Sequence, residues 1–187
     1  MKGQTTENNQ NFSQAVFGGG CFWCLEAILA KLKGVIKVTS GYAGGTMPNP
    51  TYEKVCSGKT GHAEVMKIGY DPKEIAFKDL LSVFFAMHDP TTFNRQGTDE
   101  GTQYRSIILY SDEKQKNEAE KFIEKLEKEK IFKNQIVTEV KRLENFYPAE
   151  DYHQNYFANN PEKPYCQTNI SPKITKLRKN FSQLLKN

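Results

Sequence analysis

The fold is decided by residues 15–24, Ala15-Val16-Phe17-Gly18-Gly19-Gly20-Cys21-Phe22-Trp23-Cys24. Three apolar residues favour a short buried strand, and the three glycines after them favour a turn in which only glycine relieves the backbone sterics. From Phe22 to Leu32 apolar residues recur at intervals of three and four, and Gly34 is a helix stop signal. A strand is therefore expected to lead directly into a helix, with Cys21 at the start of that helix.

The same periodicities continue along the chain. We expect further strands at 35–42, 62–70, 104–110 and 136–140, helices at 77–88 and 112–130, and a basic helix around 172–185. The order strand, helix, strand, strand, helix, strand is that of the split β-α-β plait. The prediction is an α/β two-layer sandwich with a mixed sheet, a ferredoxin-like (split βαβ) plait with an irregular C-terminal extension. Residues 15–187 form one catalytic domain in this interpretation, and residues 1–14 form a disordered polar leader.

Composition narrows the class of protein. The formal charge of +4 is small against 26 basic and 22 acidic residues, which are mixed along the chain, so no nucleic-acid partner is expected. Twenty apolar residues never occur in a row, which predicts a soluble protein without a membrane partner. Four cysteines are too few for a disulfide scaffold and favour a reducing compartment, so we expect a cytoplasmic protein that uses cysteine for chemistry. We also expect the protein to be a monomer.

Cys21 and Cys24 form the strongest chemical signal. Backbone N–H groups and the dipole at a helix start favour a thiolate, so Cys21 is a candidate nucleophile. Cys24, three residues later, shares its helical face and could form a disulfide with it. Two buried small side chains, or half of a zinc site, are the alternatives. No second close pair of ligands exists to complete a zinc site, and no metal is predicted.

Aromatic residues adjoin this nucleophile. Phe22 and Trp23, the only tryptophan, would suit a thioether-like substrate that carries a methyl group, although plain core packing is the alternative. The Gly-Cys-Phe-Trp-Cys run resembles the signature of the A-type methionine sulfoxide reductases. Five further segments resemble that family in order, namely Ser40–Gly45, Asn49–Cys56, Thr60–Glu64, Gln96–Ser106 and Phe146–Gln154. The resemblance extends from about Val16 to Cys166.

Sulfoxide reduction needs a proton for the departing oxygen. Glu64 is a single carboxylate near the start of an apolar strand, where burial would raise its pKa, although a surface-facing glutamate is the ordinary alternative. The resemblance implies that Glu64 is the catalytic acid. It also assigns the phenols of Tyr52 and Tyr104 to the sulfoxide oxygen, and Asp99 and His153 to the substrate site. Asp151 and Tyr156 lie in the same bordering segment.

The implied reaction begins with attack of Cys21 on the sulfoxide sulfur and leaves a sulfenic acid on that residue. A second thiol then forms a disulfide, which thioredoxin, or dithiothreitol in an assay, reduces without any other cofactor. Many family members have glycine at position 24 and carry the recycling cysteine in a C-terminal tail. Here Cys24 fills that position, and we expect it to be the resolving thiol, ahead of Cys166 and Cys56. The expected substrates are oxidised proteins and free methionine S-sulfoxide, which would make this a repair enzyme.

Two other functions are compatible with parts of the sequence. A thioredoxin-like dithiol oxidoreductase also has a Cys-x-x-Cys pair at a helix start, but it would leave Glu64, Tyr52 and Tyr104 unexplained. An interaction module that uses the basic terminal helix would give the cysteine pair no role.

Overall fold

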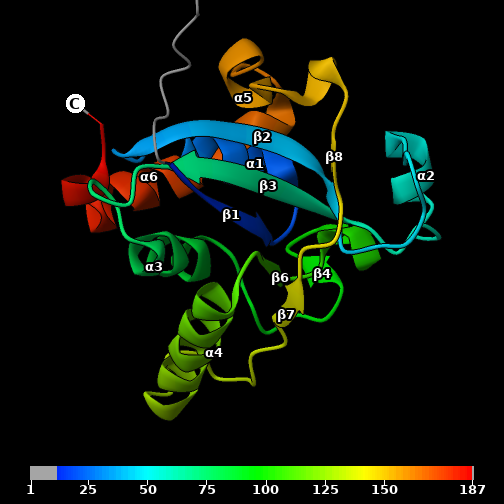
Figure 1. Ribbon diagram of the computed structural model, residues 1–187. Coiled ribbons are helices and arrows are strands. Elements are labelled where there is room, and N and C mark those ends of the chain that lie inside the picture. Colours follow the sequence, from blue (N-terminus) through cyan, green and yellow to red (C-terminus); the bar gives the residue numbers. More distant parts are fainter. Residues whose placement is uncertain (1–11, 187) are drawn as a thin grey trace, which may run out of the picture.

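The computed structural model describes residues 12–186, with a curled six-stranded sheet at its centre (Figure 1). The strand order is β7-β6-β1-β3-β2-β8. Only β6 and β7 pair in parallel, so the sheet is mixed, and the predicted mixed α/β class is confirmed. The strands are β1 (Ser13–Gly18), β2 (Val35–Ala43), β3 (Ala63–Tyr70), β6 (Ile107–Tyr110), β7 (Glu139–Arg142) and β8 (Phe146–Pro148).

One face of the sheet carries the main core. Ala15 and Phe17 of β1 pack there with the helices, whereas Val16 between them belongs to a smaller cluster on the other face. The covering helices contact one another and are α1 (Phe22–Leu29), α3 (Phe77–Met87), α4 (Glu113–Lys128) and α6 (Ser171–Asn180). β3 alternates in the same way, which turns Met66 and Ile68 toward the helices.

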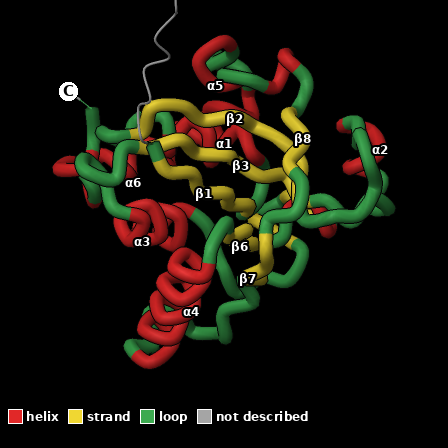
Figure 2. The backbone as a smooth tube through the Cα atoms, viewed as in Figure 1, coloured by secondary structure: helices red, strands yellow, loops and turns green. Residues whose placement is uncertain are grey.

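The remaining elements are short. They are α2 (Tyr52–Cys56), the hairpin of β4 (Arg95–Gln96) and β5 (Asp99–Glu100), α5 (Tyr156–Asn159), and a π-helical turn at Cys166–Ile170. Figure 2 shows that the chain on both sides of α2 is loop. 3₁₀ turns occur at Thr102–Tyr104, Asp151–His153 and Ser182–Leu184.

Four element boundaries differ from the sequence prediction by three residues or more. The strand expected at 104–110 is β6 at 107–110, because Thr102–Tyr104 form a 3₁₀ turn before it, and the basic helix expected around 172–185 ends at Asn180. The first helix was expected to continue to Gly34 but ends at Leu29, because the C-terminal residues take up the backbone groups that follow it: Lys33 N–H donates to the carbonyl of Leu184 at 2.8 Å. The fifth strand, expected at 136–140, is β7 at 139–142, because its register is set by pairing with β6. Residues 1–11 of the predicted leader lie outside the described part of the chain. β1 begins at Ser13, within the range predicted for the leader.

Candidate active site

The glycine turn between β1 and α1 presents Cys21. Gly20 has a φ of +88°, a left-handed conformation that favours glycine, and its N–H donates to the carbonyl of Tyr104 at 3.1 Å. A Cβ on Gly18 would lie 2.7 Å from the carbonyl oxygen of Glu64, so the turn packs directly on β3. Cys21 is the N-cap residue of α1, and it is 8 % exposed.

Cys21 and Cys24 are free thiols whose side chains hydrogen-bond to each other. Burial raises the pKa of the Cys21 thiol well above its ordinary value. The hydrogen bond from Cys21 lowers the pKa of Cys24 to about 7. The sequence predicted a thiolate at Cys21 from its place at the helix start, and the folded site differs because burial outweighs that effect. In the resting site the negative charge therefore favours Cys24, and Cys21 is protonated.

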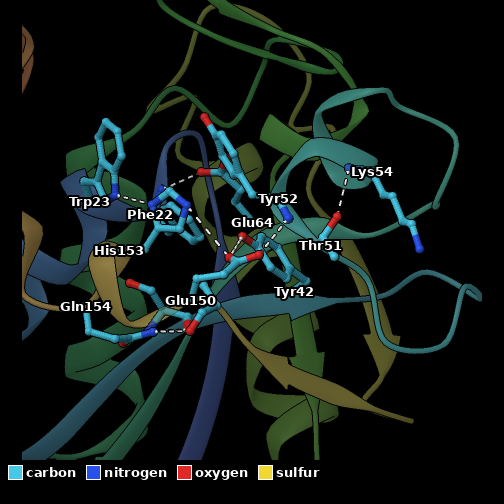
Figure 3. A network of polar contacts seen from close by, with 12 residues as sticks. Phe22, Trp23, Tyr42, Thr51, Tyr52, Lys54, Glu64, Glu150, His153 and Gln154 are labelled. Carbon is cyan, nitrogen blue, oxygen red and sulfur yellow. Dashed lines mark hydrogen bonds and ion pairs between the residues drawn. The ribbon is translucent and has the colours of Figure 1, made fainter.

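Glu64 lies on β3 opposite Tyr42 of β2, and its side chain turns toward the start of α1. Its carboxylate accepts a 3.0 Å hydrogen bond from the backbone N–H of Phe22 (Figure 3). The residue is 1 % exposed, so the surface-facing alternative is wrong. Burial raises the pKa of Glu64 to about 8. This carboxyl group is therefore mostly protonated at neutral pH, beside the Cys21 turn.

Tyr52 and Tyr104 come from different elements. Tyr52 is the first residue of α2, and its backbone N–H donates to Oε1 of Glu150 at 2.9 Å (Figure 3). Tyr104 ends the 3₁₀ turn that holds Gly20. Burial raises the pKa of both phenols, and the charge of Glu64 acts on both in the same direction. Both hydroxyls therefore remain protonated donors close to Glu64.

An aromatic cluster adjoins this acid. Phe22 is fully buried, and Trp23 is partly exposed. The indole N–H of Trp23 donates to Nδ1 of His153 at 3.1 Å (Figure 3). The ring of Tyr156 stacks on the indole, with the ring centres 3.7 Å apart. The centre of the His153 ring also lies 5.0 Å from the ring centre of Phe22 and 4.6 Å from that of Tyr52. Residues expected at the substrate site from two distant segments thus meet in one cluster.

Asp99 reaches the same site through a residue that the sequence did not indicate. The hydroxyl of Tyr165 donates to Oδ2 of Asp99 at 2.8 Å, and it lies 3.9 Å from Sγ of Cys24. Its ring meets the Trp23 indole edge-on at 5.7 Å. The C-terminal segment therefore closes over the cysteine pair.

Three site residues had no signal in the sequence, namely Glu26, Glu150 and Tyr165. Each acts through contacts with residues more than 60 positions away, and an isolated carboxylate or tyrosine predicts no such contact. Glu150 also accepts a hydrogen bond from the Tyr42 hydroxyl at 2.8 Å. Glu150 lies in the family segment Phe146–Gln154, which was its only available clue, whereas Glu26 and Tyr165 lie outside every family segment.

The other two cysteines lie apart from the pair. The sequence around Cys56, which follows the apolar Val55, favours a buried side chain, but Cys56 is exposed at the end of α2, because this short helix projects from the sheet (Figure 1). Cys166 is fully buried in the π-helical turn, directly after Tyr165. Asp151 is exposed.

Within residues 12–186, no group of three or more histidine, cysteine or acidic side chains could hold a metal ion. In that same range no helix has the length and apolar character needed to cross a membrane.

Comparison with known proteins identifies the family. The family profile described as peptide methionine sulfoxide reductase matches residues 13–185. The peptide methionine sulfoxide reductase MsrA of Nautilia profundicola is 60 % identical over 166 residues, which cover 89 % of this chain and 94 % of that protein. That of Chromobacterium violaceum is 56 % identical over 174 residues, which cover 93 % of this chain and 99 % of that protein.

Solved structures of methionine sulfoxide reductases are similar to this chain. Methionine sulfoxide reductase A of Corynebacterium diphtheriae superimposes with a TM-score of 0.79 at 34 % identity, covering 83 % of this chain and 78 % of that one. Mxr1 of Saccharomyces cerevisiae in its reduced form superimposes with a TM-score of 0.76 at 35 % sequence identity. The match covers 84 % of this chain and 91 % of that one. Mxr1 in complex with Trx2 shares the fold, with a TM-score of 0.55 at 22 % identity over 83 % of this chain and 92 % of that one. The chain belongs to the peptide methionine sulfoxide reductase family and is an enzyme of the A type.

Proposed function

We propose that this enzyme reduces methionine S-sulfoxide, free and in proteins, through a sulfenic acid on Cys21, and so repairs oxidised proteins. One observation carries this proposal: a buried carboxyl group, Glu64, is held beside the Cys21 turn with a pKa of about 8. At neutral pH this group can give a proton to an oxygen that leaves as Cys21 attacks the neighbouring sulfur.

The first half of the reaction transfers the oxygen of the sulfoxide to Cys21. Sγ of Cys21 attacks the sulfoxide sulfur while Glu64 protonates the oxygen. The S–O bond and the new S–S bond then both break as the protonated oxygen passes to Sγ of Cys21, which leaves the thioether and a sulfenic acid. The proton that Cys21 loses restores Glu64. Because burial raises the pKa of Cys21, this loss occurs during attack rather than in the resting enzyme.

The neighbouring side chains contact different parts of the substrate. Tyr52 and Tyr104 donate their phenolic O–H groups to the sulfoxide oxygen, a role that burial supports because it keeps both phenols protonated. The partly exposed indole of Trp23, packed on Phe22, forms the wall for the methyl group. Asp99 and His153 border this wall and help to orient the substrate.

Cys24 resolves the sulfenic acid by forming a disulfide with Cys21 and releasing water. Its hydrogen bond with Cys21 and its pKa of about 7 support this role, because an appreciable fraction is thiolate at neutral pH. Thioredoxin then reduces the disulfide. The complex of the yeast relative Mxr1 with Trx2 supports this donor, and the cycle needs no other cofactor.

Cys166 is the second candidate for the resolving thiol. Its neighbour Tyr165 lies 3.9 Å from Sγ of Cys24, so the fold brings this segment to the cysteine pair. Cys166 itself is fully buried, however, and burial raises the pKa of its thiol. Both properties disfavour it as a nucleophile relative to Cys24.

The wider organisation is proposed on the same basis. Residues 15–187 act as one catalytic domain and as a monomer. The neighbouring strands β6-β1-β3-β2, together with α1 and α3, support a ferredoxin-like plait. Four free thiols suit a reducing compartment such as the cytoplasm.

The proposal is tested by product analysis with separated diastereomers of a methionine sulfoxide peptide and dithiothreitol as reductant. Consumption of the S-sulfoxide alone supports it. Consumption of the R-sulfoxide, or reduction of insulin disulfides with no loss of either sulfoxide, would contradict it.

A further inference from the structure

Glu26 is a buried carboxylate that the proposed reaction does not use. It lies on α1, three residues after Trp23, and is 3 % exposed. Burial raises the pKa of Glu26, although the hydrogen bonds that it accepts oppose this shift. No ion pair to Glu26 occurs within residues 12–186. A buried charge without a cation is costly unless polar groups replace its water, so its hydrogen-bond partners indicate its purpose.

Those partners are two successive backbone N–H groups at the start of α5. Asn155 N–H donates to Oε1 at 2.8 Å, and Tyr156 N–H donates to Oε2 at 3.1 Å. Asn155 has a φ of +53°, a left-handed conformation. The hydroxyl of Ser40 adds a longer contact of 3.5 Å. One carboxylate thus fastens the start of α5 to α1, and α5 lies beside α1 in the fold (Figure 1).

The segment that Glu26 fastens holds the Trp23 indole on two sides. Tyr156 stacks on the indole face, with ring centres 3.7 Å apart and planes inclined by 6°. His153, three residues earlier, accepts the indole N–H at 3.1 Å (Figure 3). Burial lowers the pKa of His153, so its ring is neutral at pH 7 and Nδ1 remains an acceptor. The stacking contact on the indole face and the hydrogen bond of the indole N–H therefore both come from one short segment, residues 153–156.

We propose that Glu26 is a positioning residue for substrate: it fixes Tyr156 and His153, and through them it holds Trp23 where the sulfoxide methyl group binds. This inference rests on the proposed role of Trp23 as the methyl wall. Trp23 and Glu26 share α1, so a single helix supplies the wall and the anchor of its support.

Glu26→Gln keeps the size of the side chain, but its amide must direct an NH₂ group at one of the two backbone N–H donors. We expect the sulfoxide concentration at half-saturation in single turnover to rise by about tenfold, with little change in the saturating rate, because binding and not proton transfer is affected. Trp23 is the only tryptophan. Its emission maximum and anisotropy should therefore report directly that the indole has lost its fixed place.

Asp112→Ala is the matched control. Asp112 also accepts a backbone N–H at a helix start, from Gln115 at 2.9 Å, but it caps α4 away from the site. Its loss should lower the melting temperature without changing half-saturation or tryptophan emission. If Glu26→Gln behaves in the same way, Glu26 is only structural and the inference is wrong.

Two further variants separate the possible failures. Tyr156→Leu removes the stacked ring and leaves Glu26 in place, so it should reproduce the rise in half-saturation even if Glu26→Gln does not fold. A normal value for Tyr156→Leu would overturn the inference. Trp23→Leu tests the methyl wall itself. If the half-saturating sulfoxide concentration of Trp23→Leu equals that of the parent, the proposed role of Trp23 as the methyl wall is wrong. If this concentration is raised in Trp23→Leu but unchanged in Glu26→Gln, only the inference about Glu26 is wrong.

Discussion

Glu64→Gln removes a mobile proton from the site and almost nothing else. Glutamine has nearly the same shape and can still accept the 3.0 Å hydrogen bond from Phe22 N–H. With a pKa of about 8, the native carboxyl group is about nine-tenths protonated at pH 7. Loss of a general acid costs roughly 10²- to 10⁴-fold in rate, which corresponds to about 3–5 kcal/mol of activation free energy. The chemical step should slow by this factor, whereas substrate binding should change less.

The assay is the rate of methionine formation in a single turnover of reduced enzyme, measured between pH 6 and 10 (about two units either side of the Glu64 pKa). In the parent enzyme the rate should fall as the pH rises through about 8, because Glu64 loses its proton. Glu64→Gln should be slow and should lack this fall. Glu118→Gln makes the same change on α4 and serves as the control. Parent-like rates for Glu64→Gln, or an unchanged alkaline fall, would refute Glu64 as the acid.

Three other outcomes follow from the same site. Cys21→Ser should reduce turnover by orders of magnitude with unchanged circular dichroism, because a hydroxyl is a far weaker nucleophile than a thiol that loses its proton during attack; comparable turnover would contradict the assignment. Tyr52→Phe and Tyr104→Phe should each slow the chemical step by about 10- to 100-fold, and the double variant should be slower than either, since each removes one donor to the oxygen; rates equal to the parent would exclude this role. Finally, the pKa of Glu64 is raised in the folded state, so the stability that its buried neutral form contributes is present below the ordinary value of 4.5 and is lost as the pH rises through about 8. Urea unfolding should therefore give Glu64→Gln a smaller loss of stability over this range, by up to a few kcal/mol at about 1.4 kcal/mol per pKa unit; parallel pH profiles would contradict the raised pKa.

Local patterns predicted the parts of the site that depend on local geometry. The glycine turn placed Cys21 at a helix start, and the alternation of β3 turned Glu64 inward with Met66. The outer strand β7 was misplaced because its charged residues, such as Lys141 and Arg142, give no strand pattern, and only pairing with β6 sets its register.

Residues joined by long-range contacts could not be predicted. Glu26 lies within the predicted first helix, but its purpose depends on Asn155, 129 positions away. Tyr165 is one of nine tyrosines in a region without periodicity, and only the fold brings it to Asp99. The pKa of Cys21 also escaped prediction, because a helix start lowers it whereas burial, invisible in the sequence, raises it.

The chemical state of Cys21 after one catalytic event distinguishes the proposed mechanism from its alternatives. Reduced parent enzyme and Cys24→Ser are each mixed with one equivalent of a peptide that carries methionine S-sulfoxide, and the cysteines are mapped by mass spectrometry. We expect one methionine per enzyme in both, a Cys21–Cys24 disulfide in the parent, and a dimedone-trapped sulfenic acid on Cys21 in the variant, which thioredoxin does not recycle. A Cys21–Cys166 disulfide, with normal thioredoxin-dependent turnover of Cys24→Ser, would contradict the role of Cys24, and methionine formation with Cys21 unmodified would contradict the mechanism itself.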